Sequence, residues 1–222
     1  MAENEDKKNN EDENENEKKN YYIKIILLGE TGIGKTNLIN VYFDPTSFNS
    51  TESSTSNPTQ SYKLIEKNDI KFHVSIWDTM GQEKHRALTE NFIKGSNIVI
   101  FVYDLTRKQT FKDLDYWVKI VKDKLAIEKV TFGVAANKID LFDKGEVEKE
   151  EGQEYAKKIN ALFCETSAKT NPKSFSDFIQ KLLGKYLLDN KIIQNIDEIN
   201  ENNKNIHLNE NVPKKKNKKC CI

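Results

Sequence analysis

Eight consecutive residues near the beginning of the chain could hold a polyphosphate. Residues 29–36 read Gly-Glu-Thr-Gly-Ile-Gly-Lys-Thr and follow an apolar run, 21–28, that predicts a buried strand. The glycines let successive backbone N–H groups point at phosphate oxygens, and a helix that begins at Lys35 adds the positive end of its dipole. In such a loop Lys35 reaches the β- and γ-phosphates and the Thr36 hydroxyl ligates Mg²⁺. All the signature positions and both flanks are present, so the pattern indicates a nucleoside triphosphate site rather than an ordinary glycine-rich turn.

Two later segments predict which base this site accepts. Residues 134–140 read Val-Ala-Ala-Asn-Lys-Ile-Asp, an apolar strand that ends in Asn137, Lys138 and Asp140. The Asp140 carboxylate can accept hydrogen bonds from N1–H and the 2-amino group of guanine, a donor pair that adenine lacks. Residues 166–169, Thr-Ser-Ala-Lys, follow another short strand and could place a backbone N–H at guanine O6. Each tetrapeptide alone is a weak signal, but in this order behind a phosphate loop they predict a guanine nucleotide.

Three further segments carry a family resemblance. Residues 77–83 read Trp-Asp-Thr-Met-Gly-Gln-Glu, residues 101–106 read Phe-Val-Tyr-Asp-Leu-Thr, and residues 111–117 read Phe-Lys-Asp-Leu-Asp-Tyr-Trp. Over residues 21–188 the chain resembles the Ras superfamily of small GTPases, and within it the Rab family. The double cysteine near the end of the chain agrees with that resemblance. It implies an Mg²⁺-dependent switch that alternates between GTP and GDP, hydrolyses GTP to GDP and phosphate, and recruits effectors in vesicle and membrane trafficking.

The resemblance also implies a role for each matching residue. Mg²⁺ would be held by Thr36, Thr55 and Asp78. Gln82 would orient the attacking water and, with Lys35, carry the catalysis. The nucleotide would be bound by Glu30, Thr31, Gly32, Ile33, Gly34, Lys35, Thr36, Asn37, Phe48, Thr55, Gly81, Asn137, Lys138, Asp140, Ser167, Ala168 and Lys169. No arginine is placed by the sequence where it would obviously reach the γ-phosphate, so we expect slow intrinsic hydrolysis that an activating protein accelerates.

The polar segment 44–59 is the expected switch loop. The resemblance requires an aromatic side chain against guanine, for which Phe48 is the candidate, and a threonine that ligates Mg²⁺. Thr51, Thr55 and Thr59 compete for that role, and the separation from Asp78 in Rab-like chains favours Thr55. The residues after Thr55 differ from the usual Rab pattern, and Met80 stands where alanine is usual. These departures bear on effector recognition and on the rate of hydrolysis.

The coarse organisation alternates strands with helices. Strands are predicted at 21–28, 61–67, 70–77, 97–103, 130–136 and 162–164, and helices at 35–43, near 84–95, and at 111–126, 148–159 and 173–188. Asn68 and Asp69 predict a hairpin turn, so the strands on either side of them should be antiparallel. The fold class is therefore α/β: a P-loop NTPase small G-domain with a six-stranded, mostly parallel sheet and helices on both faces. In such folds ligands bind at the carboxyl ends of the strands, where the motifs fall.

Composition separates this domain from its tails. Lys plus Arg and Asp plus Glu both number 35, but residues 1–20 are almost entirely Asn, Glu, Asp and Lys. That composition predicts a disordered acidic arm before a GTPase domain at 21–188 and a flexible tail at 189–222. Three cysteines make no disulfide framework and fit a reduced compartment. Nothing resembles a signal peptide, and no apolar stretch is long enough to span a bilayer.

The end of the chain predicts attachment to a membrane. Five lysines precede Cys220 and Cys221, an ending similar to that on which Rab proteins carry two geranylgeranyl groups. The lysines would add attraction to an anionic leaflet, and no aromatic residues are interleaved with them as nucleic-acid binding would favour. We therefore expect a monomer on the cytoplasmic face of an intracellular membrane that cycles with the cytosol. Its partners would be an exchange factor, an activating protein, effectors and a prenyl-binding escort protein, with no nucleic acid among them.

Two other readings stay open at this point. A guanine-nucleotide-dependent binding module with negligible hydrolysis is suggested by Met80 and the altered switch loop. A Ras- or Rho-type signalling switch would share the nucleotide motifs, although the double cysteine and Trp117 favour the Rab type. An Arf-type protein is disfavoured because Ala2 offers no glycine for myristoylation.

Overall fold

A six-stranded sheet forms the centre of the molecule. The computed structural model describes residues 19–51, 59–67, 70–79 and 92–193. The strands are β1 (Lys19–Leu28), β2 (Thr59–Lys67), β3 (Ile70–Asp78), β4 (Ile98–Asp104), β5 (Thr131–Asn137) and β6 (Ala161–Thr166), in the order β2-β3-β1-β4-β5-β6. All neighbours are parallel except β2 and β3, which are antiparallel. The predicted fold class and the antiparallel pair are confirmed, while the turn at 68–69 lies outside the described residues.

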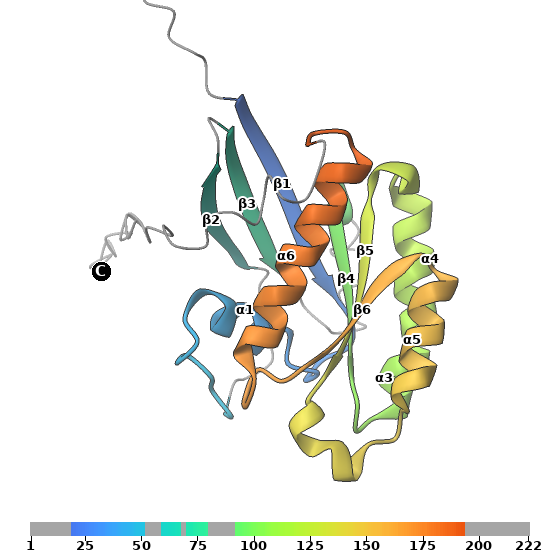
Figure 1. The fold of residues 1–222 in the computed structure, drawn as a ribbon. Helices are drawn as coiled ribbons and strands as arrows, with labels where there is room; N and C mark the ends of the chain where they lie inside the picture. The colour runs from blue at the N-terminus through green and yellow to red at the C-terminus, as the bar shows by residue number, and fades with distance from the viewer. Residues whose placement is uncertain (1–18, 52–58, 68–69, 80–91, 194–222) are drawn as a thin grey trace, which may run out of the picture.

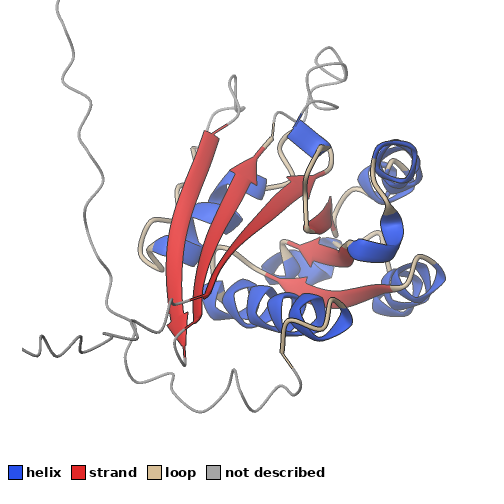
Figure 2. Cartoon of the chain, turned by 90° about the horizontal axis from the view of Figure 1, so that it is seen from above, coloured by secondary structure: helices blue, strands red, loops and turns tan. Residues whose placement is uncertain are grey.

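Helices cover both faces of this sheet (Figures 1 and 2). They are α1 (Lys35–Phe43), α3 (Lys108–Lys112), α4 (Leu114–Lys124), α5 (Lys149–Lys158) and α6 (Pro172–Asp189), with short 3-10 helices η2 (Ile127–Lys129) and η3 (Ile139–Lys144). Residues 92 and 93 are helical, and the remainder of the helix predicted near 84–95 lies outside the described residues. No helix in the described part of the chain is both long and apolar enough to cross a bilayer.

The two layers follow from the alternation of side chains along the central strands. On β1, Ile25 and Leu27 face one side and pack with the apolar residues of α1 and α6. Ile26 and Leu28 face the other side and pack with those of α4 and α5. All four side chains are fully buried. The part of β1 that is apolar at every position, residues 25–28, is therefore buried on both faces, as is typical of parallel sheets.

The helix predicted over 111–126 is in fact two short helices. It begins earlier, at Lys108, and α3 passes into α4 at Asp113, whose side chain accepts a hydrogen bond of 2.8 Å from Gln109. The apolar stripe predicted for this segment is nevertheless in the core. Leu114 and Trp117 are buried against β4, and Phe111 packs against the same cluster.

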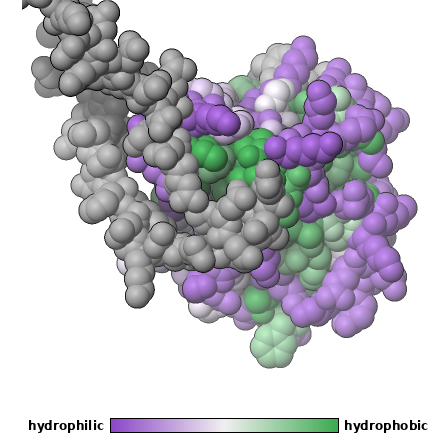
Figure 3. Space-filling view, turned by 45° about the horizontal axis from the view of Figure 1, so that its top comes forward, coloured by the Kyte–Doolittle hydropathy of each residue, from purple (hydrophilic) through white to green (hydrophobic). Residues whose placement is uncertain are grey.

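The packed structure extends past both predicted limits of the domain. Strand β1 starts at Lys19 rather than residue 21, and Ile193 is buried in the cluster under α6, five residues past the predicted end at 188. The face drawn in Figure 3 is mostly hydrophilic, with hydrophobic surface showing between the polar side chains. Among the described residues the most exposed large apolar side chains are Tyr22, Phe142 and Tyr62.

Replacement of Gly133 by alanine tests how closely α6 lies on the sheet. A Cβ at this position on β5 would lie 2.9 Å from Phe178 and 3.0 Å from Leu182, both buried on α6. Overpacking of this kind costs about 1–3 kcal/mol, more than the roughly 0.4–1 kcal/mol that Gly→Ala gains in the unfolded chain. We expect Gly133→Ala to lower the free energy of unfolding, measured by urea titration at fixed nucleotide concentration.

A double variant provides the control. Leu182→Ala removes one of the two side chains that the new methyl group would meet, so Gly133→Ala should cost less in that background than in the wild type. Strict additivity of the two changes would contradict this account of the contact.

Candidate functional site

The carboxyl ends of the strands surround a pocket of about 310 Å³. Residues from the phosphate loop, the switch segment and the loops after β5 and β6 line it together: Thr31, Gly32, Gly34, Lys35, Thr36, Asn37, Phe48, Asn49, Ser50, Thr79, Asn137, Lys138, Asp140, Leu141, Ala168 and Lys169. Segments separated by more than 100 residues therefore meet in one place, where open α/β sheets bind their ligands.

The phosphate loop owes its shape to glycines at its two ends. Gly29 follows β1 with φ of 144°, and a Cβ there would lie 2.3 Å from the carbonyl oxygen of Val102 on β4. Gly34 precedes α1 with φ of 94°, and a Cβ there would lie 2.6 Å from the amide nitrogen of Asn137. No side chain fits at either position, so the loop lies directly against the ends of β4 and β5.

Lys35 is the buried cation of this loop. Its ammonium donates to the carbonyl oxygens of Gly29 (2.9 Å) and Glu30 (2.8 Å). Burial lowers the pKa of Lys35 to about 8, although the charges of Asp78 and Glu30 act in the opposite direction. A desolvated ammonium beside a row of loop amides favours an anionic ligand, which would stabilise its charged form.

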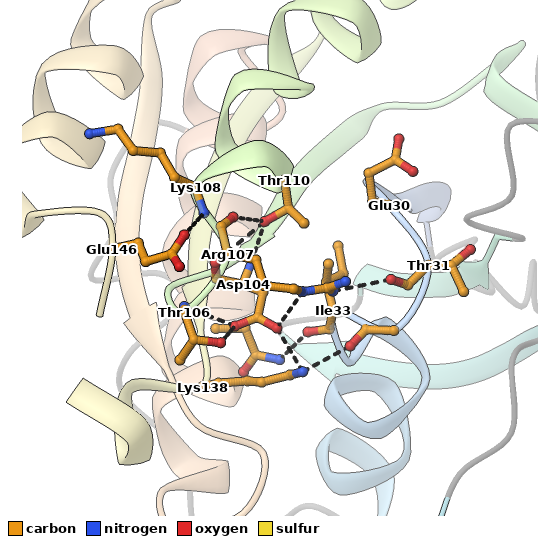
Figure 4. A network of polar contacts seen from close by, with 12 residues as sticks. Glu30, Thr31, Ile33, Asp104, Thr106, Arg107, Lys108, Thr110, Lys138 and Glu146 are labelled. Atoms are coloured by element: carbon orange, nitrogen blue, oxygen red, sulfur yellow. Dashed lines mark hydrogen bonds and ion pairs between the residues drawn. The ribbon is translucent and has the colours of Figure 1, made fainter. Parts of the chain in front are cut away.

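Three side chains from neighbouring strand ends hold the outer side of the loop (Figure 4). The amide of Asn137 donates to the carbonyl of Ile33 and the ammonium of Lys138 to that of Gly32, both at 2.8 Å. Arg107 donates from Nη2 to the carbonyl of Thr31 at 3.1 Å. The sequence had pointed to Asn137 and Lys138 but not to Arg107, whose side chain is brought to the loop only by the fold.

The buried carboxylate of Asp104 connects two of these side chains. It accepts from Lys138 at 2.7 Å and from Nε of Arg107 at 3.0 Å, and its other oxygen accepts from the backbone and hydroxyl of Thr106. Burial by itself would raise the pKa of Asp104, but the hydrogen bonds from Lys138 and Thr106 outweigh it and leave the pKa below its usual value. The carboxylate thus stays ionised and fixes two cations beside the loop.

The opposite end of the pocket has the chemistry for a guanine base. Asp140 accepts a hydrogen bond of 2.6 Å from the hydroxyl of Ser167, which holds one carboxylate oxygen in place. Lys138 has φ of 69°, an uncommon conformation for a residue with a side chain, and it sets the turn from β5 into η3 that carries Asp140. Phe48 lines the same pocket from the segment after α1.

A reciprocal pair of hydrogen bonds anchors the segment that carries Phe48. The side-chain amide of Asn37 on α1 donates to the carbonyl of Asn49, and its oxygen accepts from the N–H of Asn49, both at 2.9 Å. Asn49, Ser50, Thr79 and Leu141 line the pocket although the sequence did not single them out. Asn49 and Ser50 lie within the expected switch loop and Thr79 within the segment 77–83, while Leu141 follows Asp140, so their positions alone could have suggested them.

An oxygen pair at the start of α1 fits a magnesium ion. The hydroxyl of Thr36 donates to the carboxylate of Asp78 at 2.7 Å, next to Lys35. Mg²⁺ prefers oxygen ligands and completes its shell with water and nucleotide phosphates, so the hydroxyl of Thr36 and the carboxylate of Asp78 are suitable protein ligands. Within the described residues no cluster of three or more His, Cys, Asp or Glu side chains offers an alternative metal site.

Some predicted residues stand apart from the pocket lining. The side chain of Ile33 is fully buried in the core, so only its backbone can face a ligand. Glu30 contributes its carbonyl to Lys35, and Ser167 acts through Asp140 rather than by lining the pocket. Thr55, Gly81, Gln82, Cys220 and Cys221 lie outside the described residues.

Comparison with known proteins identifies the family. The model of the Ras family matches residues 24–186. Ras-related protein Rab-12 of Mus musculus is 34% identical over 173 residues, which cover 76% of this chain and 70% of that protein. Ras-related protein Rab-18 of Lymnaea stagnalis is 34% identical over 164 residues, which cover 72% of this chain and 80% of that protein. The chain belongs to the Ras family and is a Rab-type small GTPase.

Membership of the Rab family settles the choices that the sequence motifs left open. A Rab-type GTPase binds guanine nucleotide, hydrolyses GTP and acts in membrane trafficking. The binding-module and Ras- or Rho-type alternatives are therefore set aside. Guanine nucleotide binding by the family agrees with a pocket that joins the phosphate loop to the Asp140 motif.

The Asp140 carboxylate offers a direct test of base selection. Asp140→Asn replaces an acceptor with an amide that can donate to the 2-oxo group of xanthine. We expect the variant to lose GDP affinity by two or more orders of magnitude, roughly the range seen when a site's polar groups are left unpaired, and to gain affinity for XDP. Competition between labelled GDP and XDP measures both effects. Unchanged GDP affinity would contradict the assignment of Asp140 to the guanine base.

Proposed function

We propose that this Rab GTPase is a magnesium-dependent switch whose GTP-bound lifetime is set by water positioning at Gln82 and by an activating protein. The observation that carries the proposal is that Lys35, Thr36 and Asp140 line one pocket, with Thr36 hydrogen-bonded to Asp78 behind it. This arrangement would bind phosphate, metal and base at once, as a triphosphate-dependent switch needs.

The chemical step follows from these positions. When bound, Mg²⁺ would neutralise charge on the β- and γ-phosphate oxygens. Thr36, Asp78 and Thr55 would hold the ion, and Lys35 would hold the same phosphates from the loop. Gln82 would orient a water molecule whose oxygen bonds to the γ-phosphorus while the bond to the β–γ bridging oxygen breaks. The products are GDP and inorganic phosphate, and the proton of the water leaves with the phosphate.

Loss of the γ-phosphate would be the signal that partners read. Thr55 and the N–H of Gly81 would contact the γ-phosphate, so the segments that carry them would be held in place with GTP and released with GDP. Effectors would recognise the GTP state, and an exchange factor and an activating protein would set its timing. The unusual residues after Thr55 favour an effector set of their own.

The tail would attach this switch to a membrane. Two prenyl groups on Cys220 and Cys221, with five adjacent lysines, satisfy the need for more than one anchoring signal. A prenyl-binding escort protein would withdraw the GDP form to the cytosol. The protein would then act as a monomer on the cytoplasmic face of an intracellular membrane, with the acidic segment before β1 as an arm and the segment after Ile193 as the connecting tail.

Single-turnover hydrolysis of bound GTP in Mg²⁺ tests the assignment of Gln82. Gln82→Leu removes the group that orients the water, so we expect a slow wild-type rate and a rate lower by roughly tenfold to a hundredfold in the variant. A wild-type rate as low as that of the variant would contradict this role and would point to Met80 as the disturbing residue. Met80→Ala, assayed in parallel, should then raise the rate.

Membrane attachment is tested in cells by fractionation. The variant with both Cys220→Ser and Cys221→Ser retains the lysines but cannot be prenylated, so we expect it in the soluble fraction. A second variant that retains both cysteines but changes the five lysines to glutamine should remain partly on membranes. Sedimentation of the double cysteine variant with membranes would contradict lipid anchoring at these residues.

A further inference from the structure

Three successive peptide groups of the phosphate loop are held by their carbonyl oxygens (Figure 4). Thr31 accepts from Arg107, Gly32 from Lys138 and Ile33 from Asn137. A trans peptide is planar, and its C=O and the N–H of the next residue point in opposite directions. Each outward-held carbonyl therefore turns the following N–H inward, towards the pocket that Gly32 and Gly34 line.

Hydrogen bonds hold both the side chain and the backbone of Arg107 in place. Its Nε donates to Asp104 while Nη2 donates to Thr31, so one planar guanidinium bridges the end of β4 and the loop. The Asp104 side chain is 2% exposed and that of Arg107 is 45% exposed. The backbone of Arg107 is fixed as well, since its carbonyl accepts from both the N–H and the hydroxyl of Thr110.

We propose that Arg107 is a positioning residue for the nucleotide: it fixes the peptide between Thr31 and Gly32 so that the Gly32 N–H is aimed at the phosphates before the nucleotide arrives. Arg107 does not line the pocket and acts from behind the loop. Preorganised donors spare the ligand the cost of ordering them, so the effect should appear as slower release of bound nucleotide.

The bridge requires arginine rather than a positive charge alone. The two bonds leave from different nitrogens of one rigid group, whereas lysine has a single nitrogen on a flexible chain. Lysine could reach Asp104 or the carbonyl of Thr31 but would hold them together less firmly. If Arg107 positions the loop, Arg107→Lys should lose part of its effect. If Arg107 acts only as a positive charge, Arg107→Lys should behave as the wild type.

The experiment compares release of a fluorescent GDP analogue from the Mg²⁺-loaded protein in four forms: wild type, Arg107→Ala, Arg107→Lys and Lys108→Ala. Lys108 is the matched control, because it is the next residue and pairs with Glu151 without touching the loop. We expect Arg107→Ala to release GDP about 3- to 10-fold faster, the range for loss of one hydrogen bond. Arg107→Lys should release GDP at a rate between those of the wild type and Arg107→Ala. The rate of Lys108→Ala should stay within about twofold of the wild-type rate.

A spectroscopic measurement separates positioning from a general loss of stability. The ³¹P resonance of the β-phosphate of bound GDP should shift in Arg107→Ala, because the direction of a neighbouring N–H has changed, and should stay in place in Lys108→Ala. Each of three results would overturn the proposal. These are a GDP release rate in Arg107→Ala equal to that of the wild type, a wild-type rate in Arg107→Lys, and a β-phosphate resonance that does not shift in Arg107→Ala. The inference rests on nucleotide binding at the proposed site but not on hydrolysis, so a failure of the Gln82 assignment would leave it standing.

Discussion

The site depends on how the phosphate loop satisfies its own backbone. The carbonyl oxygens of Thr31, Gly32 and Ile33 turn outward to side-chain donors, so the N–H groups that follow them turn inward. Here the donors are side chains at the ends of β4 and β5, so the loop cannot take its shape unless those strands lie beside it. The charge of Asp104 holds two of these donors in turn. The affinity of the loop for an anion therefore depends on side chains at the ends of the sheet strands.

The close approach of glycine backbone to the sheet completes this arrangement. Gly29 and Gly34 lie where any side chain would overlap β4 or Asn137, and Gly133 lets α6 rest directly on β5. A single methyl group at these positions would push apart elements that the site needs in contact. Packing and ligand recognition are therefore coupled in this fold, since the glycines that allow close packing also set the distances within the pocket.

Much of this could be predicted because the decisive signals are local in the sequence. The phosphate loop, the Asn137–Asp140 motif and the alternation of apolar runs gave the fold class and most of the pocket lining. Arg107 was missed because its role depends on a contact 76 residues away, and nothing in its neighbours along the chain signals it. The division between α3 and α4 was missed for a similar reason, since apolar periodicity predicts a buried stripe but not where a helix bends.

The parallel arrangement also gives the molecule two distinct poles. Every parallel strand ends at the nucleotide pocket, while β1 begins and α6 ends at the opposite pole (Figure 1). The 18 residues of α6 span about 27 Å at 1.5 Å per residue. The proposed tether beyond Ile193 would therefore pull on the molecule from the side away from the pocket. Attachment and nucleotide exchange would then use separate surfaces, and a protein held at a membrane would keep the entrance to its pocket open.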